Sequence, residues 1–99
     1  MNVKITTLHF NADKKLEQFI EEKVSKLGQY SDDILEAEVF LHLERSQTKN
    51  FDSKVAKVKL DVPGVDMFAE KKSSTFEEAT DLAVSALKIQ LQKRKEKLK

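Results

Sequence analysis

The chain has 99 residues and a formal net charge of +1, with 39% apolar and 35% charged residues, so we expect one domain, residues 1–99, around a single small core. Because it contains no cysteine, a disulfide framework and a thiolate zinc site are both excluded. The amino-terminal segment lacks the apolar run of a signal peptide, and no stretch approaches the roughly 20 apolar residues of a membrane span, which predicts a cytoplasmic protein without membrane contact.

The first third of the chain predicts a strand followed by an amphipathic helix. Val3, Ile5 and Thr7 alternate with polar residues, which is the period of a strand. Asp13 is a predicted N-cap, since its carboxylate can accept hydrogen bonds from amides two or three residues later. Apolar residues then recur at steps of three and four, and they are Leu16, Phe19, Ile20, Val24 and Leu27. We expect Gly28 to end this helix as a left-handed C-cap.

Three further strands are predicted between residues 36 and 69. Segment 36–44 alternates between two faces, with Ala37, Val39, Leu41 and Leu43 on one and Glu38, Phe40, His42 and Glu44 on the other. A polar loop, residues 46–52, leads to a third run whose core-facing residues are Ala56, Val58, Leu60 and Val62. Pro63-Gly64 predicts a type II turn, because proline fixes φ at the first central position and glycine supplies the positive φ of the second. The fourth strand should then return beside the third, with its core face formed by Val65, Met67 and Ala69.

The final segment predicts a long helix. Ser74 and Glu77 have the spacing of a capping box. One apolar stripe follows, made of Phe76, Ala79, Ala83, Leu87 and Leu91. The element order is therefore β-α-β-β-β-α, an α+β fold. Because each helix has a single apolar stripe, we expect both to pack on one face of a four-stranded mixed sheet, with the first two strands parallel across a right-handed crossover.

Positive charge is concentrated at the end of this helix. In the last twelve residues Glu96 is the single acid, and the cations are Lys88, Lys93, Arg94, Lys95, Lys97 and Lys99. Six cations minus one acid give +5, so the rest of a chain of net charge +1 carries −4. A local field of this kind suits a polyanion, because lysine ammonium groups and the forked Arg94 guanidinium can both hold phosphate oxygens.

Two lysines of the first helix could extend this basic surface. Lys23 and Lys26 lie three residues apart, on one side of the helix, and would join the terminal cluster if the two helices are adjacent. In the alternative interpretation the basic end only complements its own helix dipole, and Lys23 and Lys26 form ordinary surface pairs with Glu17, Glu21 and Glu22.

Several segments carry a family resemblance. Residues Glu22-Lys23-Val24-Ser25-Lys26-Leu27-Gly28-Gln29-Tyr30 match the pattern Lys-x-x-Lys-Leu-x-x-Tyr, and residues 90–99 are similar to a basic last helix. With Pro63-Gly64 and the element order, they make the chain resemble the ribosome hibernation-promoting factors, a family that includes the ribosome-associated inhibitors and sigma-54 modulation proteins.

The resemblance implies a double-stranded-RNA-binding-domain-like fold in the decoding region of the small ribosomal subunit. There the protein would compete with messenger and transfer RNA, inhibit translation, and stabilise idle ribosomes in stationary phase or stress. The implied contacts to ribosomal RNA are Lys23, Lys26, Lys88, Lys93, Arg94, Lys95, Lys97 and Lys99. No cofactor or metal is expected. As a short form, the protein would be a monomer off the ribosome, and pairing of ribosomes would need a separate dimerising factor.

The last helix departs from the family pattern. Of the common run Asp-x-Tyr-Ala-Ala-Ile-Asp, residues 75–81 retain only Ala79 and Asp81. Ala86 and Ile89 stand where the family commonly has lysine and arginine. With fewer phosphate ligands in the middle of the helix, binding would depend more on Lys88 and the terminal cluster.

Two other functions are open. Phe40, His42 and Phe68 are predicted on the sheet face opposite the core, where single-stranded RNA bases could stack or a protein partner could dock, although Glu38 and Glu44 share that face and repel phosphate. An enzyme is the weakest hypothesis, because nothing resembles a nucleophile motif, a phosphate loop or a zinc site. The acidic pair Asp32-Asp33 is expected in a solvated loop, and we assign no catalytic residue.

Overall fold

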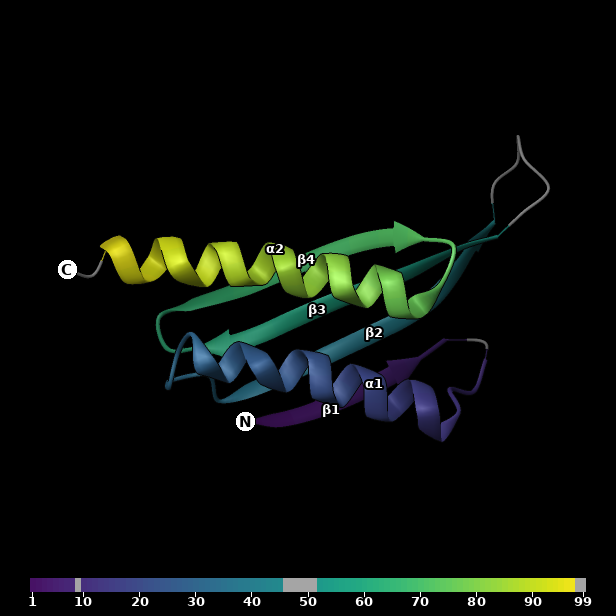
Figure 1. Cartoon of the computed structure of the whole chain (residues 1–99), viewed down its shortest axis with the longest axis horizontal. Coiled ribbons are helices and arrows are strands. Elements are labelled where there is room, and N and C mark those ends of the chain that lie inside the picture. Colours follow the sequence, from purple (N-terminus) through teal and green to yellow (C-terminus); the bar gives the residue numbers. More distant parts are fainter. Residues whose placement is uncertain (9, 46–51, 98–99) are drawn as a thin grey trace.

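The computed structural model describes residues 1–8, 10–45 and 52–97, so the predicted polar loop lies almost entirely outside the described residues. The elements in chain order are β1 (Asn2–Thr7), α1 (Lys14–Ser25), the 3-10 helix η1 (Lys26–Gln29), β2 (Glu36–Arg45), β3 (Asp52–Val62), β4 (Val65–Ser73) and α2 (Phe76–Lys97). The predicted order β-α-β-β-β-α is confirmed, with η1 as an addition (Figure 1).

The four strands form one mixed sheet in the order β1-β2-β3-β4. β1 pairs parallel with β2, whereas the β2–β3 and β3–β4 pairs are antiparallel. Both helices cover the same face of the sheet (Figure 1), as predicted. Each helix returns the chain against the direction of the strand before it, and β1 and β4 point the same way. The two helices therefore run in the same direction.

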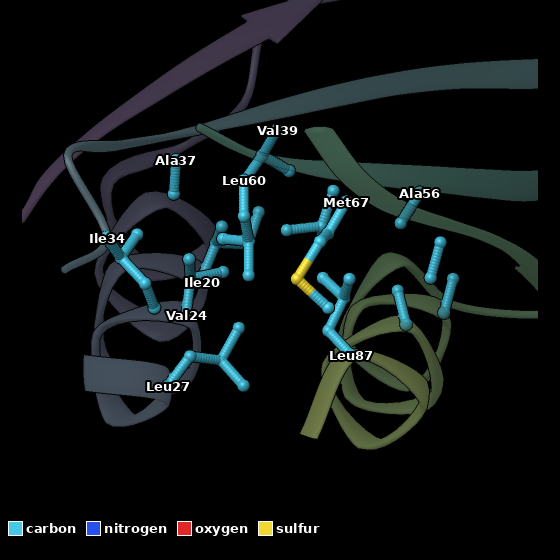
Figure 2. Close-up of a cluster of buried hydrophobic side chains, with 14 of the residues drawn as sticks. Ile20, Val24, Leu27, Ile34, Ala37, Val39, Ala56, Leu60, Met67 and Leu87 are labelled. Carbon is cyan, nitrogen blue, oxygen red and sulfur yellow. The ribbon is translucent and has the colours of Figure 1, made fainter. Parts of the chain in front are cut away.

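Apolar side chains from both helices meet the covered face of the sheet. In Figure 2, Ile20, Val24 and Leu27 come from α1 and η1 and Leu87 from α2, and they face residues of the strands. All four are fully buried. Burying an aliphatic side chain of this size contributes roughly 1.5–3 kcal/mol, so these contacts hold both helices on the sheet.

The alternation predicted for the strands is confirmed except at two ends. Ala37, Val39 and Leu41 are fully buried, but Leu43 is 42% exposed, near the end where β2 runs beyond the two helices (Figure 1). Val65, the first residue of β4, is 48% exposed. Period two fixes the face that a side chain occupies, but burial also requires a helix above it.

The prediction for Gly28 is wrong. Gly28 lies inside η1, and Gly64 is the glycine with positive φ among the described residues, at 87°. Instead of ending in a left-handed residue, α1 tightens into 3-10 geometry, and the Tyr30 amide donates to the Leu27 carbonyl at 3.0 Å. The predicted positive φ at the Pro63-Gly64 turn is confirmed, with Val62 paired to Val65 across it.

The predicted capping box at the start of α2 is wrong by one residue. Thr75, not Ser74, caps the helix, because the Glu78 amide donates to Thr75 Oγ1 at 3.1 Å and the Ala79 amide to the Thr75 carbonyl at 3.1 Å. Thr75 and Glu78 have the same spacing as the predicted pair, so sequence spacing alone does not separate the two registers. The whole predicted apolar stripe of α2 is buried, from Phe76 to Leu91.

Candidate nucleic-acid interface

The first and last helical segments are adjacent, and three side-chain contacts follow their boundary in order. Lys23 of α1 forms an ion pair with Asp81 of α2 at 3.3 Å. Further along, the Lys88 ammonium lies 5.3 Å from the centre of the Tyr30 ring. Arg94 then pairs with Asp33. The condition for one joint basic surface, that the two helices are neighbours, is therefore met.

The lysines of the first helix occupy different environments. Lys23 is half-buried, and its ammonium also lies 5.7 Å from the centre of the Phe19 ring. Its ion pair is made across the helix boundary with Asp81, rather than with the acids of its own helix that the alternative interpretation named. An ion pair this exposed is worth about 1 kcal/mol or less, so Lys23 can exchange it for another anion. Lys26, the first residue of η1, is exposed.

On α2, Lys88 and Lys93 are exposed. The helix continues through Lys95 to Lys97, whereas Lys99 lies outside the described residues. Ile89, where the resembled family commonly has an arginine, is 53% exposed. An apolar side chain thus occupies the surface in the middle of the helix, and the exposed cations stand on either side of it.

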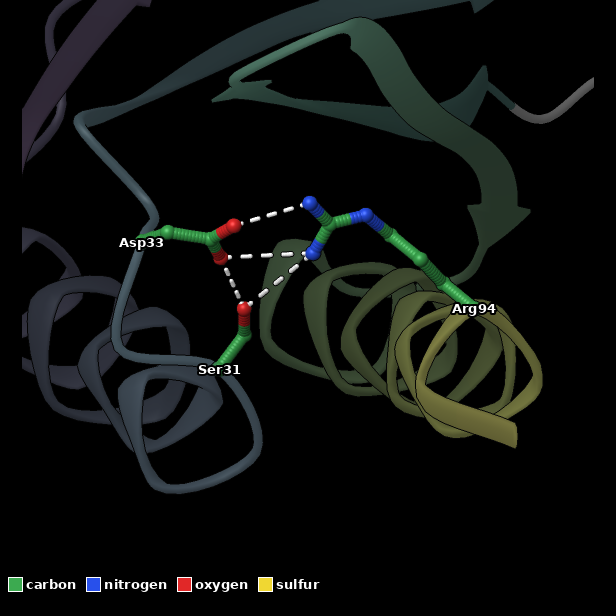
Figure 3. Close-up of polar contacts among 3 residues, drawn as sticks. All are labelled: Ser31, Asp33 and Arg94. Carbon is green, nitrogen blue, oxygen red and sulfur yellow. Dashed lines mark hydrogen bonds and ion pairs between the residues drawn. The ribbon is translucent and has the colours of Figure 1, made fainter. Parts of the chain in front are cut away.

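Among the predicted site residues whose side chains the structure describes, Arg94 is the one whose two terminal nitrogens both donate to a carboxylate of the same molecule. Its Nη2 donates to Asp33 Oδ2 at 2.8 Å, and its Nη1 donates to Asp33 Oδ1 at 3.3 Å and to Ser31 Oγ at 3.4 Å (Figure 3). Ser31 Oγ in turn donates to Asp33 Oδ1. These hydrogen bonds, first from Arg94 and then from Ser31, lower the pKa of Asp33 from 3.8 to about 2. Sequence reasoning placed Asp33 in a solvated loop and missed this pairing.

The uncovered face of the sheet has a different chemistry. Phe68 is 57% exposed there, with the Lys57 ammonium 5.3 Å from its ring centre, and Phe40 and His42 are half-buried. Their predicted face is confirmed. The same face carries an acidic row that the sequence analysis did not identify, formed where three neighbouring strands bring Glu36, Asp61 and Asp66 into register. Like charges directly opposite one another repel, and this row also repels phosphate.

The described residues give two further observations on function. Among them, no three histidine, aspartate or glutamate side chains are grouped so that they could hold a metal ion. No helix in the described part of the chain is long and apolar enough to cross a membrane.

Comparison with known proteins decides the family. The profile of the family described as "Sigma 54 modulation protein / S30EA ribosomal protein" matches residues 3–99. The chain belongs to this family. The resemblance inferred from the sequence is thus confirmed, and with it a relation to ribosome-associated proteins. No curated protein gives a significant sequence match.

Two solved structures superpose over nearly the whole chain. A ribosomal subunit interface protein from Coxiella burnetii has a TM-score of 0.84 and 21% identity, covering 97% of this chain and 99% of its own. The N-terminal domain of Protein Y from Thermus thermophilus has a TM-score of 0.80 and 26% identity, covering 94% of this chain and 98% of its own. The predicted four-stranded α+β architecture is shared with both.

Proposed function

We propose that this protein is a ribosome hibernation factor that binds ribosomal RNA in the decoding region of the small ribosomal subunit through a single domain, residues 1–99. Bound there, it excludes messenger and transfer RNA, inhibits translation and stabilises idle ribosomes in the cytoplasm during stationary phase or stress. It acts as a monomer before it binds. The observation that carries the proposal is the contact between the two helical segments, which brings exposed lysines from both onto one side of the molecule.

The proposed contacts are electrostatic and need no reactive group. Lys26, Lys88 and Lys93 are exposed and can approach phosphate directly. Lys23 can do so by leaving Asp81. Lys95, Lys97 and Lys99 extend the same cluster by sequence. Lysines on two helices can contact RNA backbones that lie apart from each other, so the shape of the RNA, rather than its base sequence, would determine specificity.

Co-sedimentation with purified small ribosomal subunits over a salt series tests this proposal. The test variant carries Lys93→Ala, Lys95→Ala and Lys97→Ala. The matched control carries Lys4→Ala, Lys57→Ala and Lys59→Ala, which remove three lysines from the uncovered sheet face. Both variants lose three positive charges, so a difference in their affinity for the small subunit shows that the position of the lysines matters.

We expect the wild-type chain to bind more weakly as salt rises, and the control to retain most of the affinity. Loss of three phosphate contacts should reduce the slope of log affinity against log salt by roughly 2 to 3 in the test variant. An equal loss of affinity in both variants would show a non-specific charge effect and would contradict the proposed site. Absence of wild-type binding at low salt would refute the proposal. Binding that leaves messenger and transfer RNA in place would refute its blocking mechanism.

The exposure of Phe68 favours a second candidate, a single-stranded RNA site on the uncovered sheet face. The acidic row on that face weighs against it, as do Glu38 and Glu44. Base stacking on an aromatic ring contributes about 1–3 kcal/mol, so in this alternative Phe68→Ala should weaken RNA binding at least fivefold. In the hibernation proposal the same substitution leaves binding to the small subunit unchanged.

A further inference from the structure

Arg94 lies in the most basic segment of the chain, yet its guanidinium is turned toward an acid. Its side chain is 22% exposed, and both of its terminal nitrogens donate to Asp33 (Figure 3). We infer that Asp33, acting through Arg94, is a positioning residue: it holds the last turns of α2 against the segment between η1 and β2, and so sets the direction in which the terminal lysines project. The effect that this inference predicts on RNA binding rests on the proposed function.

The segment that carries the acid is itself held firmly. Ile34, next to Asp33, is 7% exposed and belongs to the core. The Leu35 amide donates to the Asp61 carbonyl of β3 at 2.9 Å, and the Tyr30 amide donates to the Leu27 carbonyl at 3.0 Å. Asp33 therefore lies between two anchored stretches of backbone. Because its carboxylate is held in place, the ion pair with Arg94 can restrain α2.

The helix needs such a restraint at this place. Leu91, 1% exposed, is the last buried apolar residue among the described side chains of α2, and the helix continues to Lys97. Arg94 contacts the body of the protein one turn beyond Leu91. Among the described side chains of α2, Arg94 is the last that contacts the body of the protein, and helix ends fray where such contacts are lost.

The chemistry of the contact favours a geometric role. A planar guanidinium that makes two parallel hydrogen bonds to one carboxylate fixes direction as well as distance, which a lysine ammonium cannot do. Asp33 also neutralises the charge of Arg94, so the pair adds no net attraction for phosphate. Arg94 thus differs in role from its lysine neighbours.

Substitution of Asp33 distinguishes a positioning role from direct phosphate binding by Arg94, because the two roles predict opposite changes in RNA affinity. If Arg94 were a phosphate ligand restrained by Asp33, Asp33→Asn would release it and strengthen RNA binding. The added net charge of one unit would act in the same direction. If Asp33 positions the helix, the same variant should bind more weakly despite its extra positive charge.

The experiment compares Asp33→Asn with Asp32→Asn in the full chain. Asp32 is the exposed neighbour, so the control makes the same change in net charge at nearly the same place and leaves the partner of Arg94 intact. We expect Asp33→Asn to bind purified small subunits about fivefold more weakly than Asp32→Asn, the size of one lost side-chain interaction. Equal or tighter binding by Asp33→Asn would overturn the inference.

Variants at Arg94 give a second readout. Arg94→Gln should weaken binding at least as much as Asp33→Asn, because it removes the same contact and also one positive charge. The double variant should be no weaker than Arg94→Gln, because the contact is lost only once. The salt slope of Arg94→Gln should match that of the wild type, whereas loss of a phosphate ligand would reduce it by about 0.7–0.9. Arg94→Lys should not restore binding. A reduced slope or full activity of Arg94→Lys would contradict the positioning role.

Amide hydrogen exchange tests the inference without the ribosome. Exchange at residues 91–97 should be faster in Asp33→Asn than in Asp32→Asn, with both variants unchanged in the sheet. If the wild-type chain does not bind small subunits, the proposed function fails, while this comparison still decides the structural role. Unchanged exchange in Asp33→Asn would overturn the positioning role even if ribosome binding is confirmed.

Discussion

The ammonium nitrogen of Lys88 lies 5.3 Å from the centre of the Tyr30 ring, and this contact joins the middle of α2 to the C-cap residue that follows η1. A cation over an aromatic face at an exposed site gains roughly 0.5–1 kcal/mol. Lys88 itself stays exposed, so its charge is held in place without being neutralised. Part of the conformational entropy that a free lysine would lose on binding is already lost in the folded protein.

This arrangement predicts different effects for the two partners. Lys88→Ala should reduce the salt slope of binding to small subunits by about 0.7–0.9, because one phosphate contact is lost. Tyr30→Leu should keep that slope and lower the affinity only about two- to fivefold, because the charge remains and only its orientation is lost. Tyr30→Phe retains the ring and serves as the control. Co-sedimentation at several salt concentrations measures both quantities, and an equal change of slope in Lys88→Ala and Tyr30→Leu would contradict this division of roles.

The strands and the apolar faces were predictable because each depends on a short sequence period. Alternation identified the buried face of β2 from Ala37 to Leu41, and steps of three and four identified the stripe of α2 from Phe76 to Leu91. These patterns repeat over several residues, so a single exception does not hide them. The ends of elements depend on one or two residues each, and there the predictions at Gly28 and Ser74 were wrong.

The candidate site was predictable only in its composition. The concentration of lysine near the carboxyl terminus is visible in the sequence, but the contact of Arg94 with Asp33 joins residues 61 positions apart. Arginine in a basic run and aspartate in a polar loop give no signal of pairing, because the contact arises only after both helices pack on one face of the sheet. The acidic row has the same origin, since strand register creates it from single acids on separate strands.

Substitution by alanine should have different effects on the free energy of unfolding at the two glycines. Gly64 has φ 87°, a conformation that costs other residues roughly 1–2 kcal/mol, so Gly64→Ala should lower the free energy of unfolding by about that amount. Gly28 lies outside this region of φ, and a Cβ there would meet Met1 Cε at 3.7 Å, an ordinary contact. Gly28→Ala should therefore be neutral or stabilising by up to about 1 kcal/mol. Urea denaturation measures both variants, and a destabilised Gly28→Ala would show that the backbone there needs glycine.

Lowering the pH should lower the free energy of unfolding in a defined range, where the Asp33 carboxylate becomes protonated. The folded-state pKa of about 2 lies below the ordinary value of 3.8, so the ionised carboxylate stabilises the fold above about pH 4. That contribution is lost as the pH falls through the folded-state value. The stability difference between wild type and Asp33→Asn should be constant near neutral pH and shrink between about pH 4 and 2. The difference between wild type and Arg94→Gln should shrink in the same pH range but by less, because Arg94 is the largest cause of the lowered pKa and the Ser31 hydrogen bond remains. Urea unfolding at several pH values measures it, and a difference that stays constant down to pH 2 would contradict the ion pair.

Replacing threonine by valine should change the free energy of unfolding in opposite directions at Thr80 and at Thr75. Thr80 is fully buried on α2, and its hydroxyl oxygen has no hydrogen-bond partner among the described residues. Valine has nearly the same shape without the polar atom, so Thr80→Val should raise the free energy of unfolding by about 1 kcal/mol. The hydroxyl of Thr75, in contrast, accepts from the Glu78 amide at the start of the same helix, and Thr75→Val should cost about 1 kcal/mol. Urea denaturation of the two variants gives the comparison. If Thr80→Val were as destabilising as Thr75→Val, the buried hydroxyl would have to be hydrogen-bonded in solution.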